Sequence, residues 1–310
     1  MPSSLVIVNP HASRVRDPEV RRSLEATLVE TLGQRDGAEP TVAETSSPEE
    51  VGPLAAGAVE AGVPLVVGVG GDGTQRDIAA VLAGTQVPLG IVPAGTGNQI
   101  AAVLGIPRQP KQAVAALADA RARTIDLGQA TVEDADGATI SSTFIIGCGV
   151  GFDAELMATT PAQLKQRLGA AAYFVQGARL ALRLSATPGR VTVDERTVEA
   201  PITAALIGNM GELVPGRLGL RLPLDPADGL LDLILVGAGN TLGAFRGLLD
   251  QVRRTEIGVG DGSIRLRGRS ISIEPSEPMA LEIDGDHVGA GRRLSATVHP
   301  AALQVLAPTV

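Results

Sequence analysis

The sequence predicts two domains, an α/β domain built on a parallel sheet and a domain of antiparallel β structure. Over roughly the first 120 residues, apolar runs of strand length alternate with segments of helical periodicity, which is typical of a parallel sheet covered by helices. After Asp126 the runs alternate between apolar and polar residues, which is typical of antiparallel sheets. With 310 residues, the chain is long enough to bury two cores.

The elements of the α/β domain follow in a regular order. Leu5-Val6-Ile7-Val8 is an apolar run that ends at the turn signal Asn9-Pro10, and leucines recur at helical spacing after Pro18. Ser47-Pro48-Glu49-Glu50 has the form of a capping box with proline at the first helical position. The predicted strands are 5–8, 39–45, 65–69 and 88–92, and the predicted helices are 18–32, 47–62, 75–83, 97–104 and 110–119.

We predict that residues 126–294 form an antiparallel β-sandwich, in which Asp136-Gly137 makes a tight hairpin turn. The predicted strands are 127–133, 139–147, 190–194, 202–208, 230–236, 263–267, 270–274 and 279–284, with helical stretches at 161–184 and 241–253. Residues 294–299 and 303–307 are predicted to form a last pair of strands. We therefore assign residues 1–125 to the α/β domain, which the C-terminal segment 295–310 could complete.

Composition limits the classes of function. The net charge of −8 and the aromatic content of 2% argue against a nucleic-acid partner, which needs basic surface and stacking side chains. Cys148 is the only cysteine, so no disulfide can form within the chain, and a reducing compartment fits. No apolar run reaches the ~20 residues of a membrane-spanning helix, and the first residues do not form the pattern of a signal peptide. We therefore expect a cytoplasmic protein.

Two glycine-rich turns are the strongest functional signal. Gly70-Gly71-Asp72-Gly73-Thr74 and Pro93-Ala94-Gly95-Thr96-Gly97-Asn98 each follow a predicted strand. Such turns expose backbone N–H groups that can hold phosphates, and Asp72 can reach a magnesium ion carried by those phosphates. Asn9 and Thr45 fall at the same carboxyl edge of the predicted sheet. Since no Walker A motif occurs and both lysines lie outside the turns, the sequence predicts a nucleoside triphosphate site of another kind.

Further motifs extend the pattern over nearly the whole chain. They are Asn9-Pro10 with Ser13, Ile125-Asp126-Leu127-Gly128, Gly151-Phe152-Asp153-Ala154, Asp228-Gly229-Leu230-Leu231-Asp232 and Ile283-Asp284-Gly285-Asp286. In this order, and with the two glycine turns, the chain resembles the diacylglycerol kinase catalytic-domain superfamily, the bacterial lipid kinases related to sphingosine and ceramide kinases. The resemblance implies a Rossmann-like N-terminal domain, similar to those of NAD kinases and phosphofructokinases, and a C-terminal β-sandwich for the lipid substrate.

The resemblance also implies roles for individual residues. Asp72 would orient ATP through Mg²⁺, and Asp284 and Asp286 would be the catalytic pair, one of which takes the proton from the lipid hydroxyl group. The side chains of Asp225 and Asp228 and the carbonyl group of Leu230 would hold a second, structural magnesium ion, and Asp126 is a candidate for contact with the substrate or the other domain. The residues implied at the ATP site are Asn9, Pro10, His11, Ala12, Ser13, Thr45, Gly70, Gly71, Asp72, Gly73, Thr74, Gln75, Asp77, Gly95, Thr96 and Asn98.

Three positions depart from the pattern of the resembled family. Arg14 stands where glycine is common, Asp77 where glutamate is usual, and Asp286 where the final acidic residue is usually glutamate. The shorter aspartate places its carboxylate roughly 1.5 Å back, and a misplacement of about 1 Å can lower a rate on the order of a hundredfold. Either the backbone compensates, or Asp284 carries out the proton transfer, or the activity is weak.

We predict an ATP- and magnesium-dependent lipid kinase that converts diacylglycerol or a related neutral lipid into phosphatidic acid or an analogue, a step of phospholipid biosynthesis. A sphingoid base or ceramide as acceptor, an NAD kinase, and a catalytically weak regulator that binds nucleotide or lipid remain open. A lipid substrate implies transient contact with the inner face of the membrane, and edge strands could support a homodimer. Two basic clusters could meet the membrane or form solvated faces paired with acids: Lys165, Arg167, Arg179 and Arg183, and Arg253, Arg254, Arg265, Arg267 and Arg269.

Overall fold

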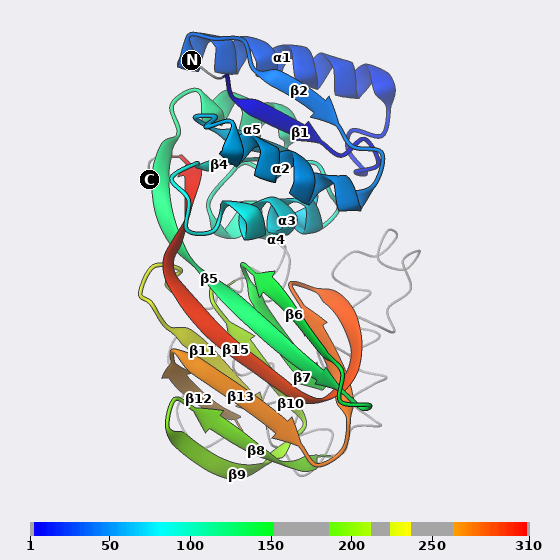
Figure 1. Cartoon of the computed structure of the whole chain (residues 1–310), viewed down its shortest axis with the longest axis vertical. Helices are drawn as coiled ribbons and strands as arrows, with labels where there is room; N and C mark the ends of the chain where they lie inside the picture. The colour runs from blue at the N-terminus through cyan, green and yellow to red at the C-terminus, as the bar shows by residue number, and fades with distance from the viewer. Residues whose placement is uncertain (1–2, 152–185, 212–223, 237–262, 309–310) are drawn as a thin grey trace. The chain divides into compact units, whose positions relative to one another are not determined.

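The computed structural model of the chain describes residues 3–151, 186–211, 224–236 and 263–308 (Figure 1). It divides into two compact units, which we describe one at a time. The first unit comprises Met1–Leu127 together with Ala301–Val310, and the second comprises Gly128–Pro300. Within the described residues, no helix is both long and apolar enough to cross a membrane.

The first unit contains a parallel sheet whose strands run in the order β4-β3-β1-β2. The strands are β1 (Leu5–Val8), β2 (Thr41–Glu44), β3 (Val66–Gly70) and β4 (Leu89–Pro93). The last part of β15 (Asp286–Ala307) adds a further parallel neighbour, in which Val305 pairs with Leu89. Because the strands are parallel, their carboxyl ends and the loops that follow them lie along one edge of the sheet.

Helices cover both faces of this sheet, as predicted (Figure 1). They are α1 (Pro18–Asp36), the short helix η1 (Pro48–Glu50), α2 (Val51–Glu60), α3 (Asp72–Leu82), α4 (Gln99–Val103) and α5 (Pro110–Leu117). On one face, α1 and α5 pack together over Val6 and Val8 of β1. The intervening Ile7 is fully buried on the opposite face of the sheet, and α2 and α3 contact each other.

Several helix ends of the first unit differ from the prediction, and α3 begins at Asp72, three residues before its predicted start. Helix α1 continues past residue 32 to Asp36, where Gly37 in the left-handed conformation (φ 71°) donates its N–H to the carbonyl group of Gly33. The predicted capping box is shifted by one residue, since Glu50 accepts hydrogen bonds from the backbone and hydroxyl groups of Ser46. Ser47 makes no side-chain cap, and the segment begins as η1 before α2.

The second unit is an antiparallel β-sandwich, as predicted. Its strands are β5 (Arg121–Asp134), which begins in the first unit, β6 (Thr139–Phe144), β7 (Gly147–Gly151), β8 (Thr187–Val193), β9 (Arg196–Ile202), β10 (Ala204–Gly208), β11 (Leu231–Val236), β12 (Ser263–Gly268), β13 (Ser270–Pro275), β14 (Met279–Ile283) and most of β15. One path of neighbours runs β12-β11-β10-β7-β14-β15, and β13, β8 and β9 continue from β15. Aliphatic side chains from these strands form the core, together with Phe144 and Cys148.

Several predicted strands of this unit need correction. The pair 294–299 and 303–307 is one continuous strand, β15, and the run 139–147 is divided between β6 and β7. The structure adds strand β9, which was not predicted and whose first four residues are exposed. The hairpin at Asp136-Gly137 is confirmed, with Gly137 at φ 85°. The predicted helices 161–184 and 241–253 lie outside the described residues.

Candidate functional site

The two glycine turns of the first unit touch each other through their backbones. A Cβ atom on Gly95 would lie 2.6 Å from the Cα of Gly71, which is too close for two carbon atoms. Because the Gly71 atom is backbone, only a shift of the main chain could relieve this clash. The N–H of Ala94 donates to the carbonyl group of Gly70 at 2.7 Å, which joins the turns at their start. Glycine is therefore required here for close approach of the chain, and the two predicted phosphate-binding turns form one surface.

Asn98 gives the second turn its shape. Its amide oxygen accepts the N–H of Gly95 at 2.9 Å, and its amide nitrogen donates to the carbonyl group of the same residue at 2.7 Å. The residue is 2% exposed and has a left-handed backbone with φ 52°. These two hydrogen bonds fix the conformation of the Pro93–Asn98 turn, in which Asn98 is buried and Thr96 is exposed.

Asp72 connects the first turn to the second. It is the first residue of α3, and its Oδ1 accepts the backbone N–H of Ile100 at 3.0 Å, which caps the start of α4. A Cβ atom on Gly97 would lie 3.0 Å from its Oδ2, so the carboxylate faces the Pro93–Asn98 turn. The Asp72 carboxylate therefore lies next to both glycine turns.

The loop after β1 is tied to the same surface. The Asn9 amide nitrogen donates to Oγ1 of Thr74 at 3.3 Å, and its amide oxygen accepts the N–H of His11 at 3.0 Å. The Ser13 hydroxyl group donates to the carbonyl group of Ala94 at 3.4 Å. Three segments that are far apart in the sequence, namely the loops after β1, β3 and β4, are therefore joined by direct hydrogen bonds.

Arg14, which stands where the resembled family commonly has glycine, braces this loop. Its backbone N–H donates to the carbonyl group of Ala94 at 2.9 Å, and its guanidinium group donates to the carbonyl group of Arg108. The side chain therefore spans from the loop after β1 to the segment between α4 and α5. Glycine could make the first of these contacts but not the second.

The predicted ATP-site residues separate into an accessible set and a buried set. The residues with accessible surface are Asn9, Pro10, His11, Ser13, Gly71, Asp72, Gly73, Asp77 and Thr96. The buried residues are Ala12, Thr45, Gly70, Thr74, Gln75, Gly95 and Asn98. Gln75 is 2% exposed and donates its amide to the carbonyl group of Gly68 at 2.9 Å, so its side chain supports β3 and does not face a ligand. Thr45 similarly donates its hydroxyl group to the carbonyl group of Val8.

Asp126 is an anchor within the first unit. Its side chain is buried, and its Oδ1 accepts the backbone N–H of Ala301 at 2.7 Å. Ala301 has a left-handed backbone with φ 50°, which is unusual for a residue with a Cβ atom. The Asp126 carboxylate therefore stabilises the strained backbone at Ala301, where β15 enters the first unit. The same hydrogen bond accounts for the burial of Asp126, the residue predicted to contact the substrate or the other domain.

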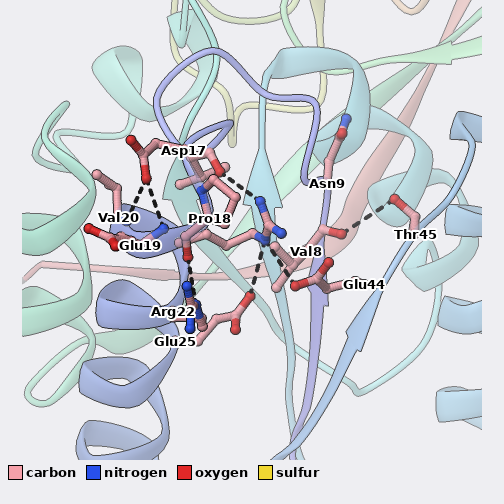
Figure 2. A network of polar contacts seen from close by, with 12 residues as sticks. Val8, Asn9, Asp17, Pro18, Glu19, Val20, Arg22, Glu25, Glu44 and Thr45 are labelled. Atoms are coloured by element: carbon pink, nitrogen blue, oxygen red, sulfur yellow. Dashed lines mark hydrogen bonds and ion pairs between the residues drawn. The ribbon is translucent and has the colours of Figure 1, made fainter.

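A cluster of charged residues adjoins Thr45 at the end of β2. Figure 2 shows this network around the start of α1, where Asp17 caps the helix by accepting the N–H groups of Glu19 and Val20. Arg21 donates to Glu44 at 2.9 Å and lies 3.9 Å from Glu25. Burial raises the pKa of Glu25 above its usual value, the Glu44 carboxylate adds to this effect, and Arg21 acts in the opposite direction.

A Glu25→Gln substitution is expected to stabilise the protein at neutral pH. The folded state holds the Glu25 proton more tightly than the unfolded state, so the free energy of unfolding falls as pH rises from about 4.5 through the raised pKa. The variant lacks this pH dependence, so its free energy of unfolding should gain on that of the parent as the pH rises from about 4.5 through the raised pKa. Urea unfolding across pH measures the difference, with exposed Glu60→Gln as control. A difference that does not change with pH would contradict the assignment.

In the second unit, Asp284 and Gly285 form the two-residue turn between β14 and β15. Both residues have positive φ, 48° and 83°, and Ile283 pairs with Asp286 across the turn. The Asp284 carboxylate accepts three backbone N–H groups, from Ile145 at 2.9 Å, Ile146 at 2.8 Å and Gly147 at 3.0 Å. This contact explains why the run 139–147 is interrupted, because residues 145–147 turn toward the carboxylate. Asp284 is thus a structural anchor for the hairpin.

The two neighbours of this anchor differ in exposure. Asp286, the first residue of β15, is exposed. Glu282 is 3% exposed, and its Oε2 accepts the N–H of Gly285 at 2.7 Å, which closes the turn from the other side. Sequence reasoning missed Glu282, although a charged residue within an apolar strand was a signal. Burial raises the pKa of the Cys148 thiol well above its usual value, and the nearby Glu282 and Asp284 carboxylates add to this, so Cys148 is a buried thiol of low reactivity.

An Asp284→Asn substitution is expected to lower the free energy of unfolding by about 2–3 kcal/mol, because an amide group turns an acceptor into a donor that faces backbone N–H groups. Thermal and urea unfolding measure the loss. Asp136→Asn is the matched control, since Asp136 is an exposed residue of another hairpin, and it should change stability by less than about 0.5 kcal/mol. An Asp284→Asn variant of full stability without activity would instead identify a reacting group.

The predicted second metal loop contains internal hydrogen bonds and an ion pair. Asp225 accepts the N–H of Ala227 at 3.1 Å, and Asp228 accepts the N–H of Leu230 at 2.9 Å. The other oxygen of Asp228 contacts the guanidinium group of Arg267. Among the described residues, no three His, Cys, Asp or Glu side chains form a group suited to a metal ion. Both oxygens of Asp228 are therefore in use, one by a backbone N–H group and one by Arg267, and a divalent cation at this loop would have to displace the guanidinium group.

The basic clusters predicted to meet a membrane are described only in part. Arg265 and Arg267 form ion pairs with Asp232, at 2.7 Å and 3.2 Å. For these two residues the alternative of pairing with acids is therefore correct. Of the remaining members of both clusters, Arg269 is exposed and the others lie outside the described residues. The family motif Phe152-Asp153-Ala154 also lies outside the described residues.

Comparisons with known proteins agree with this geometry over both units. The model of the diacylglycerol kinase catalytic domain matches residues 3–130, and the model of the YegS C-terminal NAD kinase beta sandwich-like domain matches residues 147–307. A protein of Pseudomonas aeruginosa named "Probable lipid kinase YegS-like" is 30% identical, over 99% of this chain and 96% of its own length. A protein of the same name from Pseudomonas putida is 34% identical, over 82% of this chain and 81% of its own.

Solved structures from Bacillus anthracis str. Sterne share the fold. One matches with a TM-score of 0.77 at 20% identity, and covers 98% of this chain and 96% of that chain. Another, described as a diacylglycerol kinase, matches with a TM-score of 0.70 at 17% identity, with the same coverage. At this level of identity the likeness concerns the arrangement of the chain.

Proposed function

The chain belongs to the family of YegS-like lipid kinases, and from this premise we propose that it transfers the γ-phosphoryl group of magnesium-bound ATP to a hydroxyl group of diacylglycerol or a related neutral lipid. The observation that carries the proposal is the backbone contact between Gly71 and Gly95. It joins two glycine turns into one surface at the carboxyl edge of a parallel sheet, which is where phosphates are commonly held in such folds.

The nucleotide would rest on the accessible residues of this surface. The backbone N–H groups of Gly71 and Gly73 would face the phosphates, and Asn9, Ser13 and Thr96 would offer polar side chains beside them. Magnesium carried by the nucleotide would offset charge on the phosphoryl group as it is transferred. Asp72, which already faces the second turn, would orient that complex.

Asp286 would assist the attacking lipid hydroxyl group. As the new bond from the lipid oxygen to the γ-phosphorus forms, the bond from that phosphorus to the β–γ bridging oxygen breaks and ADP leaves. The hydroxyl proton passes to the Asp286 carboxylate, and Asp284 positions the hairpin through its three N–H contacts. Product would be the phosphorylated lipid, which is phosphatidic acid when diacylglycerol is the acceptor, and the reaction would take place in contact with a membrane surface.

The acceptor is identified by transfer of labelled γ-phosphate from ATP to a panel in mixed micelles. The panel contains diacylglycerol, a sphingoid base and ceramide, with NAD as a soluble acceptor of a different kind. We expect label in one of the lipids and none in NAD. Label in NAD alone, or ATP binding without transfer to any member of the panel, would contradict the proposal and would favour an NAD kinase or a nucleotide-binding regulator respectively.

A further inference from the structure

Loop 225–230 is held by an arginine. Asp225 and Asp228 each use one carboxylate oxygen for a backbone N–H two residues ahead, which fixes the turns of the loop. The second oxygen of Asp228 contacts the Nη2 atom of Arg267, which lies 39 residues further along the chain. The loop is thus attached to β12 by a guanidinium group.

Arg267 bridges two carboxylates at once. Its Nη2 contacts Asp228, and its Nε lies 3.2 Å from Oδ1 of Asp232. Arg265 adds a second guanidinium group, whose Nε lies 2.7 Å from the same Oδ1. The planar fork of an arginine side chain allows this double contact, which a single ammonium group cannot reproduce.

The register between β11 and β12 places the charged side chains of this bridge next to one another. Asp232 of β11 lies directly opposite Arg267 of β12, and Arg265 lies two residues away on the same side of its strand. Cross-strand neighbours of opposite charge stabilise an antiparallel pair. The side chain of Asp232 is 3% exposed, and a carboxylate this deeply buried requires a cationic partner, which the two arginines supply.

The charges at this place are already balanced. An arginine guanidinium group is charged at any pH at which a protein stays folded. Two carboxylates thus meet two guanidinium groups. A divalent cation bound to Asp228 would compete with Arg267 for the same oxygen and would lie close to a group of like charge.

We propose that the guanidinium group of Arg267 does in this chain what the family resemblance assigns to a structural magnesium ion, so that loop 225–230 folds without a metal. The need for divalent cations is then confined to the nucleotide. This inference concerns the second unit alone, and it can be tested in the absence of ATP and lipid, so its outcome is independent of the proposed kinase activity.

The test is thermal unfolding followed by circular dichroism, without nucleotide, in a chelator and in excess Mg²⁺ or Ca²⁺. The parent should show the same Tm in every condition. An Arg267→Gln variant should unfold about 2–4 °C lower in chelator, and it should regain stability with added cation, because Asp228 loses its guanidinium partner and is then left to bind the cation together with Asp225. Arg292→Gln is the matched control, since Arg292 is exposed, lies in the same unit and makes no ion pair with a described residue.

Three results would overturn the inference. They are a parent protein that loses stability in chelator, an Arg267→Gln variant that behaves like Arg292→Gln, and a destabilised variant that no cation restores. An Arg267→Lys variant keeps the charge but not the fork, and it should be less stable than the parent in chelator. The comparison of the parent with and without chelator needs no substitution, so the inference remains testable even if a variant fails to fold.

Discussion

An Asp286→Asn substitution is expected to lower the rate of phosphoryl transfer to lipid by about 10²–10⁴-fold, the range typical for removal of a general base. Asp286 is exposed at the start of β15, whereas Asp284, two residues earlier, is committed to three backbone N–H groups. Of the two aspartates, Asp286 therefore has the surroundings that suit proton transfer. The affinity for ATP, measured by calorimetry, and the Tm should remain close to those of the parent.

Lengthening the same side chain provides the complementary experiment. Asp286→Glu restores the residue that the resembled family usually has, and it should match or exceed the parent in kcat, because the carboxylate reaches further toward the lipid hydroxyl group. Asp136→Asn, which removes an exposed hairpin carboxylate elsewhere in the second unit, serves as the control for charge. Full activity of Asp286→Asn, or loss of activity in Asp136→Asn to the same extent, would contradict the assignment.

A Gly95→Ala substitution is expected to weaken ATP binding and to lower the rate of phosphoryl transfer on the order of a hundredfold, as misplacement of reacting groups by about 1 Å can do. The added Cβ atom would lie 2.6 Å from the Cα of Gly71 and 3.1 Å from the Asn98 amide oxygen. Because the first of these neighbours is backbone, the two turns must separate. Nucleotide affinity, measured by calorimetry, reports the change directly.

The matched control for this prediction is Gly57→Ala. Gly57 lies within α2, and a Cβ atom added there meets nothing within 4 Å. Alanine in a helix interior is favoured over glycine by about 0.5–1 kcal/mol, so this variant should be slightly more stable and bind ATP normally. A Gly95→Ala variant that binds ATP as tightly as Gly57→Ala would show that the contact between the turns does not shape the nucleotide site.

Local sequence patterns predicted the regular parts of the fold because short-range physics determines them. Buried strands such as β1 and β3 are continuous apolar runs, and parallel topology then places the glycine turns at one edge. Strand β9 was not predicted; most of its residues are exposed, and its place is set by pairing with β8. The break predicted near Pro300 is absent because the strain at Ala301 is held by the distant Asp126.

For the candidate site, the sequence predicted which segments meet but not what each side chain does there. The contact between Gly71 and Gly95 and the partners of Asp284 join residues that are far apart in the chain, so no local spacing reveals them. The burial of Gln75 follows from its position on the inner face of α3, next to Gly68. Arg267 illustrates the same limit, because its pairing with Asp232 depends on the register between β11 and β12.

The measurement that tests the central claim most directly is recovery of labelled phosphate in the lipid fraction after incubation of the parent with γ-labelled ATP, magnesium and diacylglycerol micelles. The Gly95→Ala and Asp286→Asn variants run beside it. We predict labelled lipid from the parent, with a large loss in both variants, only one of which loses ATP affinity. Labelled lipid from all three proteins alike, or from none although the parent binds ATP, would contradict the account.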